Sequence, residues 1–235
     1  MNKNSFEKSR GVPLNVSVII DGFNVYHFLK KDKSKKWLNY MELSRKILPN
    51  YNIKSVKYFT AQSTWNPKKT HRHNIYLRAL QDAGVEVIMG KFQQKTKKVI
   101  LDNKFGNLKV SFFNKTFFGC LHQGFTAEEK QTDVAIGVEM YRAAASDEID
   151  IIALISGDTD FIPAIEAIKQ DFPDKKLFVF IPAYPKQYKI PPTLRKLIGA
   201  SNCRFLKNKI INKCIFPFSY ILKDGSILKC PPEWR

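Results

Sequence analysis

Short apolar runs rich in β-branched residues alternate along the chain with segments whose apolar residues have helical spacing. The runs that predict strands are 16–20, 53–60, 85–89, 149–155, 177–181 and 203–206. The segments that predict helices are 40–48, 70–83, 126–145, 160–170 and 192–198. A repeated strand–helix order predicts an α/β fold of three layers, in which a mostly parallel sheet is covered by helices on both faces.

The helix predicted at 126–145 carries apolar residues at spacings of four, three and four. These residues, which we expect to form its buried stripe, are Val134, Val138, Tyr141 and Ala145. Thr126 and Glu129 fit a capping box at its first turn. Gly84 fits the position that follows a helix end, before the next strand.

Two segments interrupt the alternation. Residues 91–122 predict a β-hairpin insert that turns near 103–107, and residues 207–235 follow the last predicted strand. A length of 235 residues favours one domain with a small appendage. We therefore expect a single domain over 14–206, with a C-terminal extension, 207–235, that packs on it.

The net charge of the chain indicates more about its partners than the rest of its composition does. The chain has 39 Lys and Arg against 21 Asp and Glu, a net charge of +18 that favours a polyanionic partner, either nucleic acid or an acidic membrane surface. No apolar run approaches the roughly 20 residues of a membrane span, and no apolar stretch follows the basic residues of 1–13. The four cysteines form no CxxC pair. We expect a soluble, cytoplasmic protein with reduced thiols and no membrane partner.

Acidic residues follow two of the predicted strands. Asp21 ends the first strand, and Asp158 with Asp160 follows the fourth. Parallel strands bind ligands at their shared carboxyl edge, which the helical residue Asp133 can also face. Carboxylates without a counter-charge repel one another, so their convergence favours a bound cation. Oxygen-only ligands suit Mg²⁺ or Mn²⁺.

Each acid also has an ordinary structural explanation. Asp21 before Gly22 fits a simple turn, and Asp158 or Asp160 fits a helix N-cap. Asp133 fits a solvated helix residue paired with Lys130. For any one of them alone the ordinary explanation is the better one, so the prediction of a metal site depends on all four together.

Three motifs resemble those of one nuclease family. DGFNVY at 21–26, EKQTDV at 129–134 and SGDTDFIP at 156–163 are similar, in order and spacing, to motifs of the NYN domain family of PIN-like metal-dependent ribonucleases. The resemblance extends over about 16–206. It implies a PIN-like, Rossmann-like fold and hydrolysis of RNA phosphodiester bonds. It also implies that Mg²⁺ or Mn²⁺ is held by the catalytic residues Asp21, Asp133, Asp158 and Asp160.

Several further residues are expected to contact the RNA. Asn24 matches the asparagine of the family beside its first acid, and Ser156 has a hydroxyl suited to orienting the metal site. Lysines crowd the insert, where aromatic residues either stack on bases or pack the hairpin. The full set of expected substrate-binding residues is Asn24, Lys130, Ser156, Thr159, Arg72, Lys91, Lys95, Lys97 and Lys98.

The leading prediction is therefore a cytoplasmic Mg²⁺- or Mn²⁺-dependent ribonuclease that acts on single-stranded or structured RNA. The alternative is an RNA-binding regulatory module that retains the acidic site with little or no turnover. A small-molecule phosphatase would use the acids but does not account for the net charge of +18. The sequence leaves self-association, the identity of the RNA and the number of metals open.

Overall fold

A seven-stranded sheet forms the centre of the protein. The computed structural model describes residues 12–62, 66–100, 121–184 and 189–235, with the backbone alone for 92–100 and 121–130. The strands lie in the order β4-β3-β2-β1-β5-β6-β7, in which β4 is antiparallel to β3 and all other neighbours are parallel. Their bounds are β1 Asn15–Asp21, β2 Asn52–Ala61, β3 Glu86–Ile100, β4 Leu121–Lys130, β5 Ile151–Ile155, β6 Lys176–Ile181 and β7 Cys203–Phe205.

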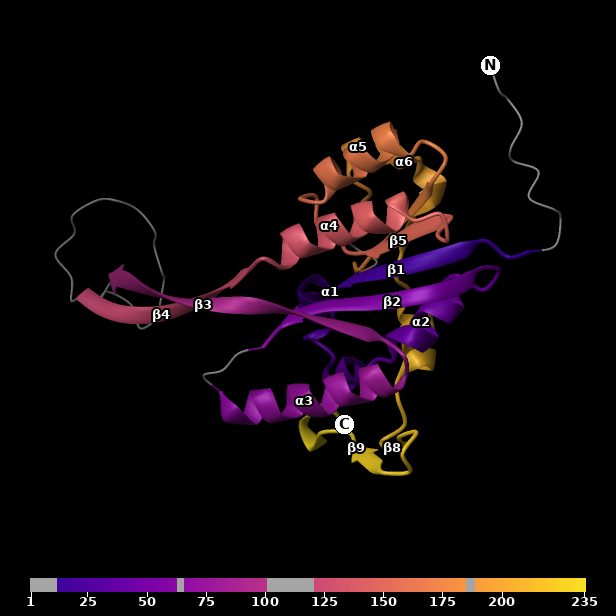
Figure 1. Cartoon of the computed structure of the whole chain (residues 1–235). Coiled ribbons are helices and arrows are strands. Elements are labelled where there is room, and N and C mark those ends of the chain that lie inside the picture. The colour runs from indigo at the N-terminus through magenta and orange to yellow at the C-terminus, as the bar shows by residue number, and fades with distance from the viewer. Residues whose placement is uncertain (1–11, 63–65, 101–120, 185–188) are drawn as a thin grey trace, which may run out of the picture.

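Helices cover both faces of this sheet (Figure 1). One face carries α1 Gly22–Leu29, α2 Tyr40–Ile47 and α3 Pro67–Asp82, and the other carries α4 Thr132–Ala145, α5 Ile162–Asp171 and α6 Pro192–Ile198. The predicted three-layer α/β fold is confirmed. Among the helices of the described residues, none combines the length and the apolar character needed to cross a bilayer.

Each face of the sheet has its own hydrophobic core. Along β1, Val16, Val18 and Ile20 point into the core under α1, α2 and α3, whereas Ile19 points into the core under α4, α5 and α6. Alternate residues of a strand face opposite sides, so both sets are buried when helices cover both faces. This double burial makes the central strands continuously apolar and explains why the sequence identifies them.

The predicted stripe of α4 is wrong. Val134, Val138 and Tyr141 are 72%, 52% and 39% exposed, and Ala145 is exposed as well. The residues of α4 that pack on the sheet are instead Ile136, Met140, Ala143 and Ala144. Both sets of residues have helical spacing. The second set is buried because it lies on the side of α4 that faces the sheet.

The start of α4 also differs from the prediction. Residues 126–130 belong to β4, where they pair with 91–95 of β3, so Thr126 and Glu129 form no capping box. The antiparallel hairpin of the insert is confirmed, but its ladder continues to Lys130 instead of ending at 122. The turn predicted near 103–107 lies outside the described residues. Gln131 joins β4 to α4 with a φ of 75°, the left-handed conformation.

A helix that the sequence did not predict, α1, begins directly after β1. Asp21 is its N-cap and accepts a hydrogen bond from the Asn24 amide. Gly22 is the first helical residue, and it lies against β2. A Cβ atom there would come within 2.6 Å of the Tyr58 ring and closer still to the Phe59 carbonyl oxygen. Only glycine therefore allows α1 to begin at this point.

The C-terminal segment packs against α3 and the residues before α2. It contains α7 Asn208–Ile211 and a small hairpin of β8 Ser219–Ile221 and β9 Ile227–Lys229. Trp37 donates a hydrogen bond from Nε1 to the Pro217 carbonyl, and Tyr220 donates one to Asp82 at the end of α3. The Trp234 ring packs edge-on against Tyr76 of α3. The segment thus completes one of the two cores.

Three of the cysteines are described. Cys203, Cys214 and Cys230 are buried free thiols. Burial raises the pKa of each thiol, that of Cys214 to about 11, which keeps it protonated and unreactive near neutral pH. Cys120 lies outside the described residues.

Gly22→Ala is expected to destabilise the fold because its new methyl group would meet the backbone of β2. Overpacking of this kind lowers the unfolding free energy by about 1–3 kcal/mol. Gly137→Ala in α4 is the matched control, since its Cβ would lie at an ordinary 3.6 Å from Ala164. That control should stabilise the helix by roughly 0.5–1 kcal/mol. Urea unfolding of both variants checks this, and equal stabilities would contradict the close approach of α1.

Candidate active site at the carboxyl edge of the sheet

Asp21 is the buried centre of the site. Its carboxylate lies at the carboxyl end of β1 and is 4% exposed. One oxygen accepts the Asn24 amide at 3.0 Å, and the other accepts the Ser156 hydroxyl, which follows β5, at 2.8 Å. The same side chain therefore caps α1 and joins the ends of two neighbouring strands.

A short hydrogen-bonded loop follows β5. The Ser156 hydroxyl accepts the Asp158 amide at 3.1 Å, and the Asn24 side chain accepts the Gly157 amide at 3.0 Å. Asp158 in turn accepts the Asp160 amide at 3.0 Å. These bonds fix the backbone between β5 and α5 relative to β1, while the carboxylates of Asp158 and Asp160 stay exposed.

Asp133 approaches the same edge from the first turn of α4. It is exposed, and its pKa is raised by partial burial and then by the charges of Asp158 and Asp160. The pKa of Asp21 is raised first by burial, and the charges of Asp133 and Asp158 raise it further, although two hydrogen bonds to the carboxylate act against this. The structure thus brings the acids of three separate motifs close enough for their charges to interact.

These carboxylates have no positively charged partner in the part of the chain that the structure describes. No Lys, Arg or His there forms an ion pair with any of the four aspartates. In a protein of net charge +18, an acidic group without a cation is costly unless a bound ion offsets it. The oxygen donors are of the type that Mg²⁺ and Mn²⁺ prefer.

The carboxylates of the acidic group lie near one another without meeting at a single point. Among the described residues, no three His, Cys, Asp or Glu side chains converge closely enough to hold a metal ion. Asp133, Asp158 and Asp160 are exposed, so their side chains can change rotamer without disturbing the core. Asp21, which is held by two hydrogen bonds, is the fixed member of the group.

The structure also bears on the ordinary explanations. Asp21 does not form the simple turn that was its ordinary explanation, because it caps α1, which accounts for one of its oxygens. Neither Asp158 nor Asp160 caps α5, because its N-cap is Phe161 and no side chain bonds there. The side chain of Lys130, the suggested partner of Asp133, lies outside the described part of the chain.

The expected substrate-binding residues fall into three groups. Asn24 and Ser156 bond to the loop and to Asp21, and Ser156 is only 1% exposed, which favours a positioning role. Thr159 and Lys91 are exposed, and Arg72 on α3 pairs with Glu233 at 2.7 Å. For Lys95, Lys97, Lys98 and Lys130 the structure gives the backbone position on β3 or β4 alone.

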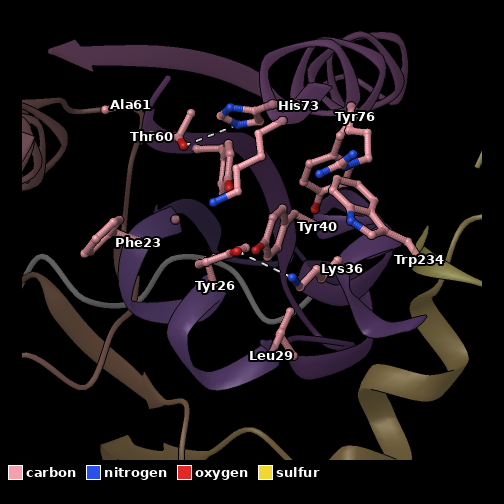
Figure 2. Close-up of a pocket in the computed structure, with 14 residues that line it drawn as sticks. Phe23, Tyr26, Leu29, Lys36, Tyr40, Thr60, Ala61, His73, Tyr76 and Trp234 are labelled. Carbon is pink, nitrogen blue, oxygen red and sulfur yellow. Dashed lines mark hydrogen bonds between the residues drawn. The ribbon is translucent and has the colours of Figure 1, made fainter. Parts of the chain in front are cut away.

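A cavity of about 330 Å³ opens beside Gly22, on the side of β1 where α1 and α3 lie. Its aromatic lining includes Tyr26, Tyr40, Tyr58, Tyr76 and Trp234, of which Figure 2 labels all but Tyr58. These residues come from five separate segments between 22 and 235. No pattern in the sequence indicates this cavity, because no spacing relates residues so far apart in the chain.

Asp133→Asn should relieve repulsion within the acidic group. Because the pKa of Asp133 is raised in the fold, its ionised form destabilises the native state, and this effect grows as the pH rises through the raised pKa. Without metal, the variant should exceed the wild type in unfolding free energy at pH 7 by about a few tenths of a kcal/mol, a small gain since the side chain is exposed. The gain should vanish as the pH falls toward 3.8. Urea titrations from pH 4 to pH 8 measure it, and a gain independent of pH would contradict the electrostatic cause.

The chain is similar to known proteins of two bacteria. A protein similar to this chain is 6-hydroxy-3-succinoylpyridine 3-monooxygenase HspA of Pseudomonas putida, which is 26% identical over 193 residues, or 72% of this chain and 60% of that protein. The chain therefore spans about three fifths of the length of that relative. A solved protein of unknown function from Vibrio parahaemolyticus RIMD 2210633 matches 85% of this chain and 97% of its own, with 20% identity and a TM-score of 0.48.

The family assignment comes from the NYN domain model, which matches residues 15–189. This range contains Asp21, Asp133, Asp158 and Asp160, together with the strands that position them. The protein belongs to the NYN domain family, a family of PIN-like nucleases.

Proposed function

We propose that this protein is a metal-dependent ribonuclease that hydrolyses RNA phosphodiester bonds with Mg²⁺ or Mn²⁺. The observation that carries the proposal is the group of four aspartates at the carboxyl edge of β1 and β5, whose charges interact and which pair with no cation among the described residues. Membership of the NYN family supports nuclease-type chemistry.

Asp21, Asp133, Asp158 and Asp160 would hold the metal, and the exposed side chains of the other three would move toward Asp21 when it binds. A divalent cation supplies an activated water and stabilises charge on the phosphate oxygens. The chain itself contributes a fixed carboxylate at Asp21, which Ser156 and the Asn24 amide orient. Asn24 also holds the loop that carries Asp158 in place through the Gly157 amide.

RNA as the substrate is supported by the charge of the molecule. The net charge of +18 favours binding of a polyanion. Lys91, whose side chain is exposed, lies where β3 continues into the insert, and its backbone pairs with Lys130 directly before α4 and Asp133. On this proposal, Lys91 and the lysines of the insert would bind the phosphates of a strand that approaches the acids.

Asp158→Asn should abolish cleavage while leaving the fold intact. The amide keeps the oxygen that accepts the Asp160 amide, so the loop after β5 retains its shape. The loss of rate should exceed the roughly 100-fold that removal of an outer-shell partner costs a metal enzyme. Asp174→Asn, an exposed acid outside the group, is the control. Gel assays on single-stranded and hairpin RNAs, with Mg²⁺, Mn²⁺ or EDTA, measure the rates.

The same assay separates the second candidate, an RNA-binding module with little turnover. The observation that favours it is that no three acids converge among the described residues. Binding of RNA by the wild type with no metal-dependent cleavage would establish this function and refute the nuclease. Cleavage that Asp158→Asn does not reduce would place the catalytic residues elsewhere.

Mg²⁺ or Mn²⁺ should raise the melting temperature of the wild type, since an ion that binds only the folded state stabilises it. At a concentration of 100 times Kd the gain is about 2.7 kcal/mol. Asp21→Asn should reduce this gain, because Asp21 is the fixed ligand. Thermal melts with and without metal test the site apart from catalysis. An equal gain in a variant with all four aspartates changed to Asn would place the metal at another site.

The name of the Pseudomonas relative suggests a third candidate, oxidation of a hydroxypyridine. The aromatic cavity beside Gly22 is the observation that favours it. Calorimetric titration with 6-hydroxy-3-succinoylpyridine tests this candidate directly. We expect no saturable binding, and submillimolar affinity that is lost on Tyr26→Leu would make it the leading function.

A further inference from the structure

We propose that the aromatic cavity beside Gly22 binds one unpaired RNA base, next to the phosphate that the acidic group receives. The inference rests on the proposed function and adds a subsite to it. Its basis is the combination of aromatic walls, neutral polar groups inside, cations at the rim and a lining residue, Gly22, that directly follows Asp21.

The walls are flat and held in place. The rings of Tyr40 and Tyr58 stack with centroids 4.9 Å apart and an interplanar angle of 26°, and Tyr76 meets Tyr58 edge-on at 6.3 Å. Tyr76 is fixed by a 2.7 Å hydrogen bond from its hydroxyl to the Leu38 carbonyl. Trp234 closes the side formed by the C-terminal segment. Tyr40, Tyr58 and Tyr76 are only 2%, 4% and 5% exposed, so they form a rigid floor. Tyr26, which is 44% exposed, is the lining ring that offers a face on which a base stacks.

The polar groups inside the cavity are uncharged near neutral pH. Burial raises the pKa of Tyr40 and Tyr76 well above the usual value, so their hydroxyls stay protonated. Burial also lowers the pKa of His73, which keeps its ring neutral, with one donor and one acceptor nitrogen. The hydroxyl of Thr60 lies 3.5 Å from the Nε2 atom of His73 (Figure 2). Neutral donors and acceptors suit the edge of an uncharged base.

Positive charge lies among the more exposed residues of the lining. Lys36 lies over the ring of Tyr26, with its Nζ atom 4.7 Å from the ring centroid. Lys69 is exposed, and Arg72 is half-buried and shares its charge with Glu233. A volume of about 330 Å³ is at the small end for a ligand pocket and suits a single ring system. With one base inside the cavity, Lys36, Lys69 and Arg72 would bind the phosphates of the RNA that remains outside it.

The cavity and the acidic group include consecutive residues at the end of β1. Gly22 lines the cavity and directly follows Asp21, whose carboxylate belongs to the acidic group. The charge of Asp21 also contributes to the raised pKa of Tyr40 in the cavity wall. A strand whose base enters the cavity therefore has an adjacent phosphate near the acids. This continuity favours a nucleotide of a longer chain over an isolated small molecule.

The test is abasic scanning of a short single-stranded RNA. Binding is measured without metal to the full-length Asp158→Asn protein, so that the RNA survives. Removing the base at one position should weaken binding about tenfold, the size of one base–aromatic stacking contact, while other positions change it little. A fluorescent 2-aminopurine at that position should be quenched by the protein. This arm needs no substitution in the cavity.

A double-mutant cycle links that base to the cavity. Tyr26 is 44% exposed, so Tyr26→Leu should fold normally, and it should weaken binding of the intact RNA about tenfold. It should leave binding of the RNA with the critical abasic site unchanged. Tyr141→Leu on α4, 39% exposed and on the opposite face of the sheet, is the matched control and should change neither RNA.

The outcomes separate the subsite from the nuclease. Coupling between Tyr26 and one base supports the subsite even where no RNA is cleaved, in which case the nuclease proposal alone fails. Cleavage without such coupling overturns the subsite and leaves the nuclease standing. Failure to bind RNA, or occupation of the cavity by a small heteroaromatic acid that does not compete with RNA, also overturns the subsite.

Discussion

The buried carboxylate of Asp21 is the constraint on which the functional edge of this protein depends. Burial disfavours the charged form of the carboxylate and raises its pKa. Hydrogen bonds from the Asn24 amide and the Ser156 hydroxyl stabilise the carboxylate in this buried position. These two bonds tie α1 and the loop after β5 to the end of β1. Because an unpaired buried acceptor would cost about 1–3 kcal/mol, these bonds hold the three segments together.

The sheet order explains why this end of β1 is a site at all. From β1 the chain proceeds through β2 to β3 on one side, and through β5, β6 and β7 on the other. The place where the strand order reverses is a topological switch point. The connections leave it in opposite directions and so open a crevice outside the carboxyl ends of the strands. The acidic group lies where β1 meets β5, and the aromatic cavity lies where β1 meets β2. Gly22 separates the two sites by a single residue.

Prediction from the sequence succeeded for the strands and failed where two solutions share one pattern. The buried strands were identified because both faces are covered, which makes runs such as 151–155 entirely apolar. The stripe of α4 was misplaced because Val134 and Ile136 each begin a series with helical spacing. Residues 126–130 were assigned to a helix, yet their pairing with β3 makes them a strand. The helix α1 was missed because its capping residue, Asp21, also fits a turn.

The sequence alone determined that acids follow two parallel strands, and parallel strands place such residues at one edge whatever their distance along the chain. Only the tertiary structure decided the rest. Which face of α4 is buried, and therefore how Asp133 is presented, depends on where the sheet lies. The cavity is built from aromatic residues of α1, α2, β2, α3 and the C-terminal segment. No local pattern joins them, because they are brought together by packing across one core.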